Sequence, residues 1–448
     1  MQTATAYVNA VYEKACQKDT EQKEFLQALK EFFDTITPVL AQHPQLIEEN
    51  ILERLIEPER IYQFRVPWTD DQGKVQVNRG FRVQYNATIG PYKGGLRFHP
   101  SVNQSIMKFL GFEQTFKNCL TGLPIGGGKG GSDFDPKGKS DREVMRFCQS
   151  FMTELQKYIG PDQDVPAGDI GVGSREIGYL FGQYKKINSY QAGVITGKPI
   201  PMGGSLGRTE ATGYGLVYFA NEMLKEANQS FKGQRVVVSG SGNVAIYAIK
   251  KVHELGGTVI ACSDSNGYIF DKNGIDVATL KQVKEVERKR LTAYLEKNPK
   301  ATYHEGNVWQ LEANFTIALP CATQNEIDEV AAKHILAKGV FAVVEGANMP
   351  SDLAAIACYH EAGILYGPSK AANAGGVAVS ALEMSQNNLR LSWTLEEVDE
   401  KLKEIMKTIF LTCRNTAKAY GVAGNYLSGA NIASFLKIAE AMVAQGVV

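Results

Sequence analysis

A single lysine with glycines on both sides, Lys129, is the strongest chemical signal in the sequence. It lies in residues 122–131, which read Gly-Leu-Pro-Ile-Gly-Gly-Gly-Lys-Gly-Gly. Glycine allows the backbone to approach a bound molecule closely, and it leaves the lysine without bulky neighbours that would cover its ammonium group. A phosphate-binding P-loop is excluded, because that motif needs glycine where Leu123 stands and serine or threonine where Gly130 stands. Two interpretations remain open, a lysine for substrate chemistry and a flexible surface turn.

Three further polar side chains border glycine-rich segments. Lys93 precedes two glycines in residues 91–100 (Pro-Tyr-Lys-Gly-Gly-Leu-Arg-Phe-His-Pro), and Gln114 and Lys117 lie on one face of a predicted helix. Lys117 alone could simply stabilise a helix C-terminus through the helix dipole. Together the lysines predict a site for a small anionic substrate. Crowding and desolvation lower the pKa of a lysine, so that it can act as a base or polarise a carbonyl group near neutral pH.

An acid, Asp169, lies in another glycine-rich loop, residues 165–173 (Val-Pro-Ala-Gly-Asp-Ile-Gly-Val-Gly). Such an aspartate could also be an ordinary turn or cap residue. Asn348 and Ser380 each follow an apolar stretch in the second half of the chain, where cleft residues of a doubly wound sheet are found. The six histidines show no metal-ligand spacing, so we assign them no role and expect no metal.

Residues 236–264 have the pattern of a dinucleotide-binding βαβ unit. The apolar run 236–239 leads into Gly240-Ser-Gly-Asn-Val-Ala245, a helix that extends to Leu255, and a second apolar run at 258–262. In such a unit the first glycine makes the tight turn, the second admits the pyrophosphate, and a small third residue lets helix and strand pack closely. The phosphates would lie at the helix N-terminus, where free N–H groups and the helix dipole favour anions.

The choice between NAD and NADP stays open on residue chemistry. Asp264 follows the second strand, close to the place where an acid binds the ribose hydroxyls of NAD. A carboxylate there should repel a 2′-phosphate, yet Ser263 and Ser265 flank it and a basic cluster follows that could bind one. That cluster, which could equally be a solvated helix face, consists of Lys284, Arg288, Lys289 and Arg290.

Hydrophobic periodicity divides the chain into two parts. Residues 1–60 predict helices, and the alternation over 75–85 after the turn at 70–73 predicts paired strands. A helix over 101–118 is predicted to bury Ile106, Phe109, Leu110 and Phe116, and another begins at the capping box of Ser140. From about residue 205 strands alternate with helices, which predicts a parallel sheet covered on both faces.

We therefore expect an α/β protein with two domains. The first is a mixed α/β substrate and oligomerisation domain, residues 1–205, to which residues 425–448 return. The second is a doubly wound, Rossmann-type dinucleotide-binding domain, residues 206–424.

Composition narrows the class of protein. Of the 448 residues 44% are hydrophobic, enough for real cores, and Lys+Arg and Asp+Glu both total 48. With no net charge, neither nucleic acid nor an anionic membrane is expected as a partner. The N-terminus lacks a signal-peptide pattern and no apolar run approaches membrane-spanning length, so no membrane is expected. The seven cysteines are dispersed, which predicts reduced thiols in the cytoplasm.

Five segments together resemble the hexameric glutamate dehydrogenases of bacteria and lower eukaryotes, within the Glu/Leu/Phe/Val dehydrogenase superfamily. They are residues 90–100 (GPYKGGLRFHP), 124–131 (PIGGGKGG), 166–173 (PAGDIGVG), 239–245 (SGSGNVA) and 370–376 (KAANAGG). The resemblance runs from about residue 50 to the C-terminus and is loosest in the first fifty residues and between about 275 and 314.

The resemblance implies an amino-acid oxidoreductase that converts L-glutamate reversibly to 2-oxoglutarate and ammonium, and hence ammonium assimilation. It implies a homohexamer, and the form of the 239–245 segment is similar to that of NADP-preferring members, which favours NADP over NAD. It also implies residue roles. Lys93 and Ser380 would bind the side-chain carboxylate. Gln114 and Lys117 would bind the α-carboxylate end, with a backbone contact from Gly168. Lys129 would activate water for attack on the imine, and Asp169 would move a proton to or from the substrate nitrogen. The cofactor would be held by Thr212, Gly240, Ser241, Gly242, Asn243, Val244, Asp264 and Asn348.

Three alternatives remain. One is an NAD-dependent glutamate dehydrogenase, and another is a branched-chain or aromatic amino-acid dehydrogenase of the same superfamily. Those enzymes have an apolar residue in place of Lys93, because a lysine facing hydrocarbon would be costly. The third is a non-catalytic sensor of glutamate or nucleotide, which the presence of both Lys129 and Asp169 argues against.

Overall fold

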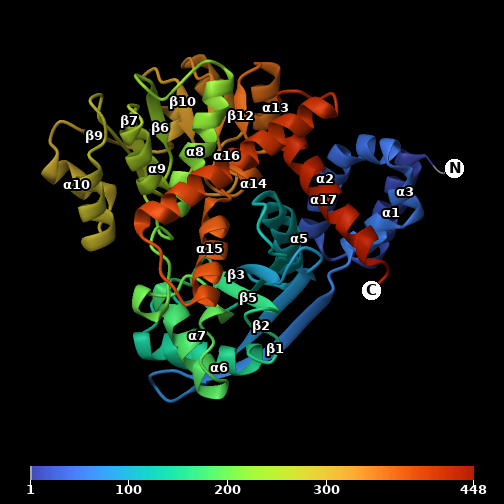
Figure 1. Ribbon diagram of the computed structural model, residues 1–448. Coiled ribbons are helices and arrows are strands. Elements are labelled where there is room, and N and C mark those ends of the chain that lie inside the picture. Colours follow the sequence, from blue (N-terminus) through green and yellow to red (C-terminus); the bar gives the residue numbers. More distant parts are fainter. Residues whose placement is uncertain (1–2) are drawn as a thin grey trace. The chain divides into compact units, whose positions relative to one another are not determined.

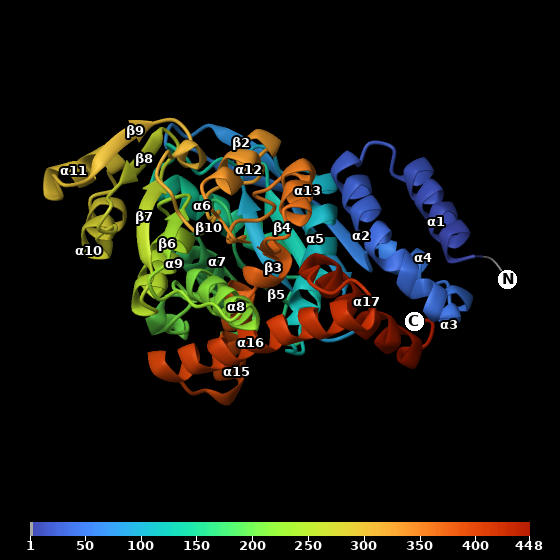
Figure 2. The same ribbon diagram turned by 90° about the horizontal axis from the view of Figure 1, so that it is seen from above.

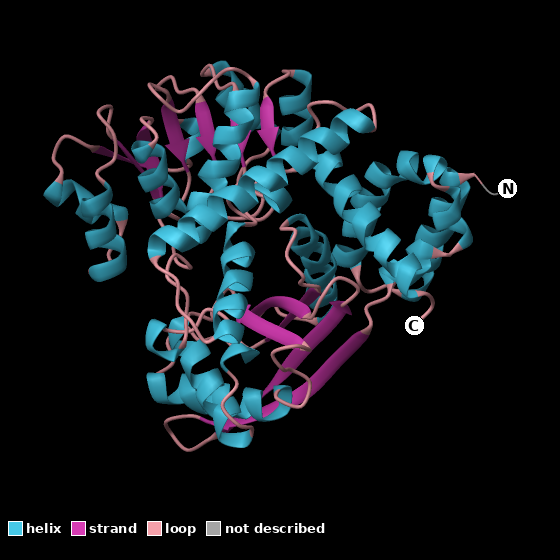
Figure 3. Cartoon of the chain, viewed as in Figure 1, coloured by secondary structure: helices cyan, strands magenta, loops and turns pink. Residues whose placement is uncertain are grey.

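Two β-sheets, each with its own helices, organise residues 3–448, which the computed structural model describes (Figure 1, Figure 3). The chain divides into two units. Unit 1 contains the residues up to Leu206, Val377–Val398 and Asn431–Val448, and unit 2 contains Gly207–Gly376 and Asp399–Ala430.

Unit 1 is built on a five-stranded mixed sheet with the strand order β1-β2-β4-β3-β5. Strands β1, β2 and β4 pair antiparallel, whereas β3 lies parallel to both β4 and β5. The turn at 70–73 joins β1 to β2, as the alternation predicted. The bounds are β1 (Arg60–Thr69), β2 (Val75–Asn86), β3 (Tyr92–Phe98), β4 (Gly127–Ser132) and β5 (Asp164–Gly168).

Helices cover both faces of this sheet. Val83 and Tyr85 of β2 contact α5 on one face, and Phe98 of β3 packs with Phe147 and Phe151 of α6 on the other. The predicted capping box begins α6, where the Ser140 hydroxyl accepts from the Glu143 amide at 3.1 Å. The helices of unit 1 are α1 (Ala4–Lys18), α2 (Lys23–Gln42), α3 (Pro44–Glu48), α4 (Ile51–Ile56), α5 (Gln104–Leu120), α6 (Asp141–Leu155) and α7 (Ser174–Ile187), with 3₁₀ turns η1 (Ala192–Val194) and η2 (Ile200–Met202).

Unit 2 is built on a seven-stranded sheet with the strand order β12-β11-β10-β6-β7-β8-β9. The five strands from β12 to β7 are parallel, and β8 and β9 add an antiparallel edge. The bounds are β6 (Arg235–Val238), β7 (Thr258–Ser263), β8 (Gly267–Phe270), β9 (Thr302–Glu305), β10 (Ile317–Leu319), β11 (Ala342–Val344) and β12 (Leu365–Gly367). The predicted doubly wound parallel sheet is therefore present.

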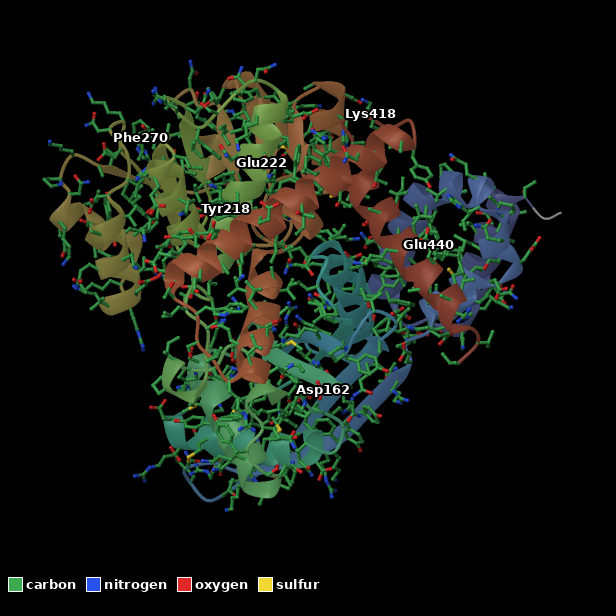
Figure 4. All side chains as sticks on the ribbon, viewed as in Figure 1. Asp162, Tyr218, Glu222, Phe270, Lys418 and Glu440 are labelled. Carbon is green, nitrogen blue, oxygen red and sulfur yellow. The ribbon has the colours of Figure 1, made fainter. Side chains whose placement is uncertain are left out.

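Figure 2 shows α8 (Ala211–Glu226) and α9 (Asn243–Glu254) on one face of the unit 2 sheet, and α12 (Glu329–Ala337) and α13 (Leu353–Glu361) on the other. Helix α16 (Leu395–Ala419) is fastened to α8 by Tyr218, labelled in Figure 4, whose hydroxyl donates to the Asp399 carboxylate at 2.7 Å. The shorter helical segments are α10 (Val277–Lys281), a π-helical turn η3 (Gln282–Val286), η4 (Leu291–Ala293), α11 (Tyr294–Lys297), η5 (Val308–Gln310) and α14 (Ser369–Ala372).

The two units differ from the predicted domain bounds at two places. Residues 425–430 belong to unit 2, so the return to unit 1 begins at Asn431 rather than at residue 425. The stretch Val377–Val398 belongs to unit 1 rather than to one uninterrupted dinucleotide-binding segment 206–424. Helix α15 (Gly375–Leu389) runs from unit 2 into unit 1, where Ala381 and Met384 pack against Ile125 and Val165.

The prediction for the buried face of α5 is confirmed at Phe116 and wrong at the other three residues it named. Met107, Phe112 and Phe116 are fully buried, whereas Ile106, Phe109 and Leu110 are only half-buried. Polar residues such as Thr115 share the buried face, so an apolar count alone points to the wrong side of the helix.

The last helix, α17 (Tyr426–Gln445), is the one described helix with the length and apolar composition of a membrane span. Half of that window is buried inside the protein, and Phe435 packs edge-on against Phe32 of α2 with the ring centroids 6.2 Å apart. The apolar residues of α17 thus contribute to the core of unit 1, as in many soluble proteins.

Candidate active site

Lys129 lies in the middle of β4 rather than on a surface turn. It pairs with Val83 of β2 in the strand register, and the residue is 6% exposed. Of the two interpretations left open by the sequence, the flexible surface turn is therefore wrong. A lysine buried in a sheet has a fixed position, which is a requirement for a group that must meet a substrate atom.

The glycines around Lys129 serve close packing. A Cβ atom at Gly127 would lie 1.9 Å from Thr115 Oγ1 of α5, and one at Gly94 of β3 would lie 1.6 Å from the Gly128 carbonyl oxygen. Side chains at these positions would push α5 and β3 away from β4. The glycine-rich pattern thus brings helix and strands close together around a single long side chain.

Asp169 follows β5 directly and faces Lys129. The Lys129 Nζ lies 3.3 Å from Asp169 Oδ2, and Arg97 of β3 donates through Nε to the same oxygen at 2.7 Å. The two cations come from the strands next to one another in the order β4-β3-β5, so the sheet topology assembles all three groups. Asp169 is thus an ion-pair partner of both, rather than only a turn residue.

These contacts set the charge states. Burial lowers the pKa of Lys129, and the nearby cations Arg97 and Arg82 lower it further. Asp169 raises it, but the net effect is a pKa below the usual value for lysine. Burial alone would raise the pKa of Asp169, but Lys129 and Arg97 outweigh it, so that the pKa of the carboxyl lies below its usual value. The pair combines a lysine that is easier to deprotonate with an ionised aspartate.

Lys93 of β3 is buried in the same sheet, with 1% of the residue exposed. Its ammonium donates to the Val165 carbonyl at 3.0 Å, to Thr196 Oγ1 at 2.7 Å and to the Pro166 carbonyl at 3.5 Å. Val165 is its partner in the β3–β5 register, so the backbone itself fixes the place of this charge.

Gln114 and Lys117 lie half-buried on α5, which packs over β3 and β4. Gln114 Nε2 donates to Asn118 Oδ1 at 2.6 Å, and Asn118 Nδ2 donates in turn to the Lys93 carbonyl at 3.0 Å. The side chain of Gln114 also lies over Gly94, at 3.4 Å from a Cβ atom there. The structure therefore brings α5 and the lysine-bearing strand β3 together, as the motifs predicted.

Gly168 and Ser380 complete the predicted substrate residues. Gly168 ends β5, opposite Leu96 in the register, and a Cβ atom there would lie 2.5 Å from the Val172 carbonyl. Ser380 is buried on α15, next to Ala381, which packs against Val165. Since the Val165 carbonyl binds Lys93, the helix of Ser380 and the ammonium of Lys93 share one neighbour.

The dinucleotide motif folds as its sequence predicts, from β6 through a glycine turn into α9. Gly240 has φ of +85°, a left-handed conformation that favours glycine. Gly242 precedes the first helical residue, no side chain caps the helix, and a Cβ atom at Gly242 would meet open space. The N-terminal N–H groups of α9 therefore point to the place where a pyrophosphate would bind.

A cavity of about 1040 Å³ lies at this turn, wholly within unit 2. Of the predicted cofactor residues, Gly240, Ser241, Gly242, Asn243 and Asp264 line it. Thr212, Val244 and Asn348 are not part of this lining. Thr212 packs against Gly376, and Asn348 Oδ1 accepts from Asn373 Nδ2 at 2.8 Å.

The Asp264 carboxylate bonds to its own turn. Its Oδ1 accepts from the Asn266 amide at 2.9 Å and the Gly267 amide at 3.3 Å, and its Oδ2 accepts from the Leu291 amide at 3.2 Å. These bonds neutralise part of the charge that would repel a 2′-phosphate.

Basic side chains border the same cavity beyond Asp264. Arg290 Nη1 donates to Ser265 Oγ at 2.7 Å, and Lys284 lines the cavity as well. Lys289 instead pairs with Glu287 at 3.1 Å. The basic cluster is a π-helical turn followed by a loop, so it is not a single helix face. Three of its members are exposed, as a solvated surface would be: Arg288, Lys289 and Arg290.

Some residues of these sites were missed from the sequence. Arg97 contacts Asp169 but was assigned no role, although it lies four residues after Lys93 on one strand and hence on the same face. Thr196 lies in an irregular segment, and nothing in its sequence surroundings marks it. Cys321 and Thr323 line the dinucleotide cavity from the loop after β10.

Comparisons with known proteins identify the family of the chain. A family model described as Glutamate/Leucine/Phenylalanine/Valine dehydrogenase matches residues 203–446, and one described as Glu/Leu/Phe/Val dehydrogenase, dimerisation domain, matches residues 58–186. The NADP-specific glutamate dehydrogenase of Giardia intestinalis is 57% identical over 437 residues, 96% of this chain and 97% of the relative. The NAD(P)-specific glutamate dehydrogenase of Xylanibacter ruminicola is 57% identical over 440 residues, 98% and 99% of the two chains.

Solved structures agree as well. The crystal structure of Plasmodium falciparum glutamate dehydrogenase is similar with a TM-score of 0.97 and 53% identity, covering 99% of this chain and 96% of that chain. The chain therefore belongs to the Glutamate/Leucine/Phenylalanine/Valine dehydrogenase family.

Proposed function

We propose that this chain is an NADP-dependent oxidoreductase that catalyses the reversible oxidative deamination of L-glutamate to 2-oxoglutarate and ammonium. Near-full-length relatives with this activity in their names support it. The observation that carries glutamate, rather than another amino acid, is the buried ammonium of Lys93 on β3. A hydrocarbon side chain docked against that ammonium would leave a desolvated charge beside apolar atoms, which is unfavourable.

The side chain of the substrate is recognised by Lys93 together with Ser380. A carboxylate that meets the Lys93 ammonium exchanges its hydration for a charge-assisted hydrogen bond, and a serine hydroxyl can donate a second one. Gln114, Lys117 and the backbone of Gly168 bind the α-carboxylate end. Cations thus bind both carboxylates of the substrate, and the Cα–H bond is held in a fixed position between them.

Lys129 and Asp169 carry out the proton chemistry. With its lowered pKa, Lys129 supplies a neutral amine that removes a proton from water as the water attacks the imine carbon. The ammonium so formed then stabilises the carbinolamine oxygen. Asp169, ionised beside two cations, accepts a proton from the substrate nitrogen and returns it when ammonia leaves.

NADP fits the residues around the cavity in unit 2. The uncapped N-terminus of α9 and the glycine turn of Gly240 and Gly242 would hold the pyrophosphate, with Ser241 in the turn and Asn243 and Val244 in the first turn of α9. Ser265, Lys284 and Arg290 would bind the 2′-phosphate, and Thr212 and Asn348 would contact the nicotinamide half. When bound, NADP accepts the hydride released from the substrate Cα.

The residues of unit 1 form the substrate and oligomerisation domain and those of unit 2 the dinucleotide domain. A homohexamer is the assembly implied by the sequence resemblance, and the match to a dimerisation-domain model over residues 58–186 supports self-association. All seven cysteines are unpaired in the structure, which supports a cytoplasmic location.

The first test is the near-ultraviolet absorbance of reduced nicotinamide, followed with 2-oxoglutarate and ammonium and either NADPH or NADH. Oxidation of NADPH in preference to NADH is the expected result. Faster oxidation of NADH would refute the cofactor assignment alone, and no oxidation of either would refute the substrate.

The Lys93→Leu variant then tests glutamate itself. Removing one partner of a buried ion pair predicts a loss of about 10²–10³-fold in kcat/KM for glutamate. Lys157→Leu, at an exposed lysine paired with Glu154, is the matched control and should leave the kinetics unchanged. Unchanged glutamate kinetics in Lys93→Leu would contradict the assignment.

A further inference from the structure

A fully buried ion pair in unit 1 joins the segment after Thr196 to α15. Lys198 Nζ donates to Glu383 Oε1 at 2.7 Å, to Asn387 Oδ1 at 2.8 Å and to the Ile195 carbonyl at 2.6 Å, and both charged side chains are fully buried. All three hydrogens of the ammonium are thereby used.

Glu383 also binds the backbone of the segment that carries Lys198. Its Oε2 accepts from the Gly197 amide at 2.9 Å, and its Oε1 lies 3.4 Å from the Lys198 amide. Gly197 has φ of +82°, a left-handed conformation that turns its amide toward the carboxylate. Residues 195–198 are therefore held against α15 by the Glu383 carboxylate and the Lys198 ammonium together. Lys198, Glu383 and Asn387 thus form a clamp.

Each side of the clamp carries a residue of the side-chain subsite. Thr196, between the bonded residues Ile195 and Gly197, accepts from Lys93 Nζ at 2.7 Å through its hydroxyl, and its amide donates to the Pro166 carbonyl at 3.0 Å. On α15, Ser380 precedes Glu383 by three residues and Asn387 by seven, so all three lie on one face of the helix. A shift of α15 against residues 195–198 would change the separation of Ser380 and Lys93.

Stability alone does not explain such a pair. Replacing a fully buried ion pair by apolar side chains of similar volume is often neutral or stabilising, because two charges must be desolvated to form it. A hydrogen-bonded network of this kind instead restricts the geometry to one arrangement. The hydrogen bonds of the clamp fix orientation on both sides. On one side they come from side chains on one face of α15, and on the other from the backbone amides of Gly197 and Lys198.

We propose that Lys198, Glu383 and Asn387 position Thr196 and Ser380 around the Lys93 ammonium, and that this clamp sets the preference for glutamate over amino acids with a hydrocarbon side chain. The inference rests on the proposed function. The three are positioning residues, since they act on the substrate through Thr196, Lys93 and Ser380.

The test compares L-glutamate with L-norvaline, whose side chain lacks the carboxylate, in three variants. Glu383→Gln keeps the shape and removes the charge. Lys198→Met combined with Glu383→Leu removes the pair without leaving an unpaired charge. Lys108→Met is the matched control, because Lys108 forms another largely buried pair of unit 1, with Asp19 at 2.8 Å.

The first two variants should raise KM for glutamate by about 10–100-fold, the range for losing charge-assisted hydrogen bonds. Three other quantities should change by less than about threefold if the variants alter only the side-chain subsite. They are the kcat for glutamate, the kcat and KM for norvaline, and the KM for NADP. Lys108→Met should lower the melting temperature without changing the ratio of the two substrates.

Four outcomes would overturn the proposal. Parallel losses with glutamate and norvaline, or the same selectivity change in Lys108→Met, would show a merely structural role. If the Glu383→Gln variant folds and its selectivity is unchanged, the role of the clamp is refuted. The proposed function is still supported in that case, provided that the wild type turns over glutamate. Absence of glutamate turnover in the wild type would overturn both.

Discussion

Replacing Arg97 by methionine should move the pH dependence of catalysis to higher pH. Arg97 donates to the same Asp169 oxygen that Lys129 contacts, at 2.7 and 3.3 Å, so the two cationic nitrogens lie no more than about 6 Å apart. Arg97 lowers the pKa of both Lys129 and Asp169. Its removal therefore raises both pKa values, and Asp169 is then also free to approach Lys129, which raises the pKa of the lysine further.

The size of the shift follows from the geometry. At about 6 Å and an effective dielectric constant of about 20, two unit charges interact by roughly 3 kcal/mol, and this repulsion disfavours the protonated form of Lys129. The charged hydrogen bond from Arg97 to Asp169 contributes about 1.5–3 kcal/mol. Because solvent reaches part of the site, we expect the lower end of these energies, which displaces the acid limb of the pH profile by about one pH unit.

The assay is kcat/KM for glutamate as a function of pH in the direction of oxidative deamination, which needs the neutral amine of Lys129. Activity is lost as pH falls through the pKa of that amine, so raising the pKa moves the acid limb to higher pH. Arg146→Met is the matched control, since Arg146 pairs with Asp71 on another part of unit 1 and should leave the profile in place. An acid limb that stays within about 0.3 pH units of wild type in Arg97→Met would refute this account of the site.

Three other predictions follow from the two sites. Lys129→Ala should lower kcat by about 10²–10⁴-fold and leave cofactor affinity, measured by fluorescence titration, unchanged; surviving turnover would rule out the assigned base. Arg290→Ala should lower kcat/KM for NADP about 10–100-fold with little effect on NAD, whereas Lys289→Ala, at a residue paired with Glu287, should leave their ratio unchanged. Gly127→Ala should destabilise the protein by about 1–3 kcal/mol, because the added methyl group would collide with Thr115. Gly182→Ala, in open space on α7, should stabilise it by about 0.5–1 kcal/mol. Urea unfolding measures both changes, and equal effects would contradict the packing argument.

Local patterns predicted the dinucleotide half of the molecule well, because each part of it is encoded by neighbours in the sequence. The turn at Gly240, the start of α9 and the strands β6 and β7 occur where the apolar runs and glycines placed them. The capping box of Ser140 is equally local and begins α6 as expected.

Features that depend on contacts between distant segments were not predictable in the same way. The assignment of Val377–Val398 to unit 1 depends on packing against Val165 and on the Lys198–Glu383 pair, which joins residues far apart in the chain. The role of Arg97 depends on the order β4-β3-β5, which no motif states. Lys93, Lys129 and Asp169 could be found because glycines mark them, but the lowered pKa values of Lys129 and Asp169 depend on neighbours supplied by the fold.

The bonding of Asp264 has a consequence for protein engineering. An acid after the second strand of a dinucleotide fold is an obvious position to mutate when cofactor preference is to be reversed. Here its carboxylate holds together the turn at Asn266 and Gly267 and the backbone of Leu291. Replacing it would loosen both the β7–β8 turn that carries Ser265 and the separate segment before η4 that carries Arg290, so affinity for either cofactor would fall. A mutant library aimed at redox-cofactor exchange should therefore vary Ser265 and Arg290 and keep Asp264 constant.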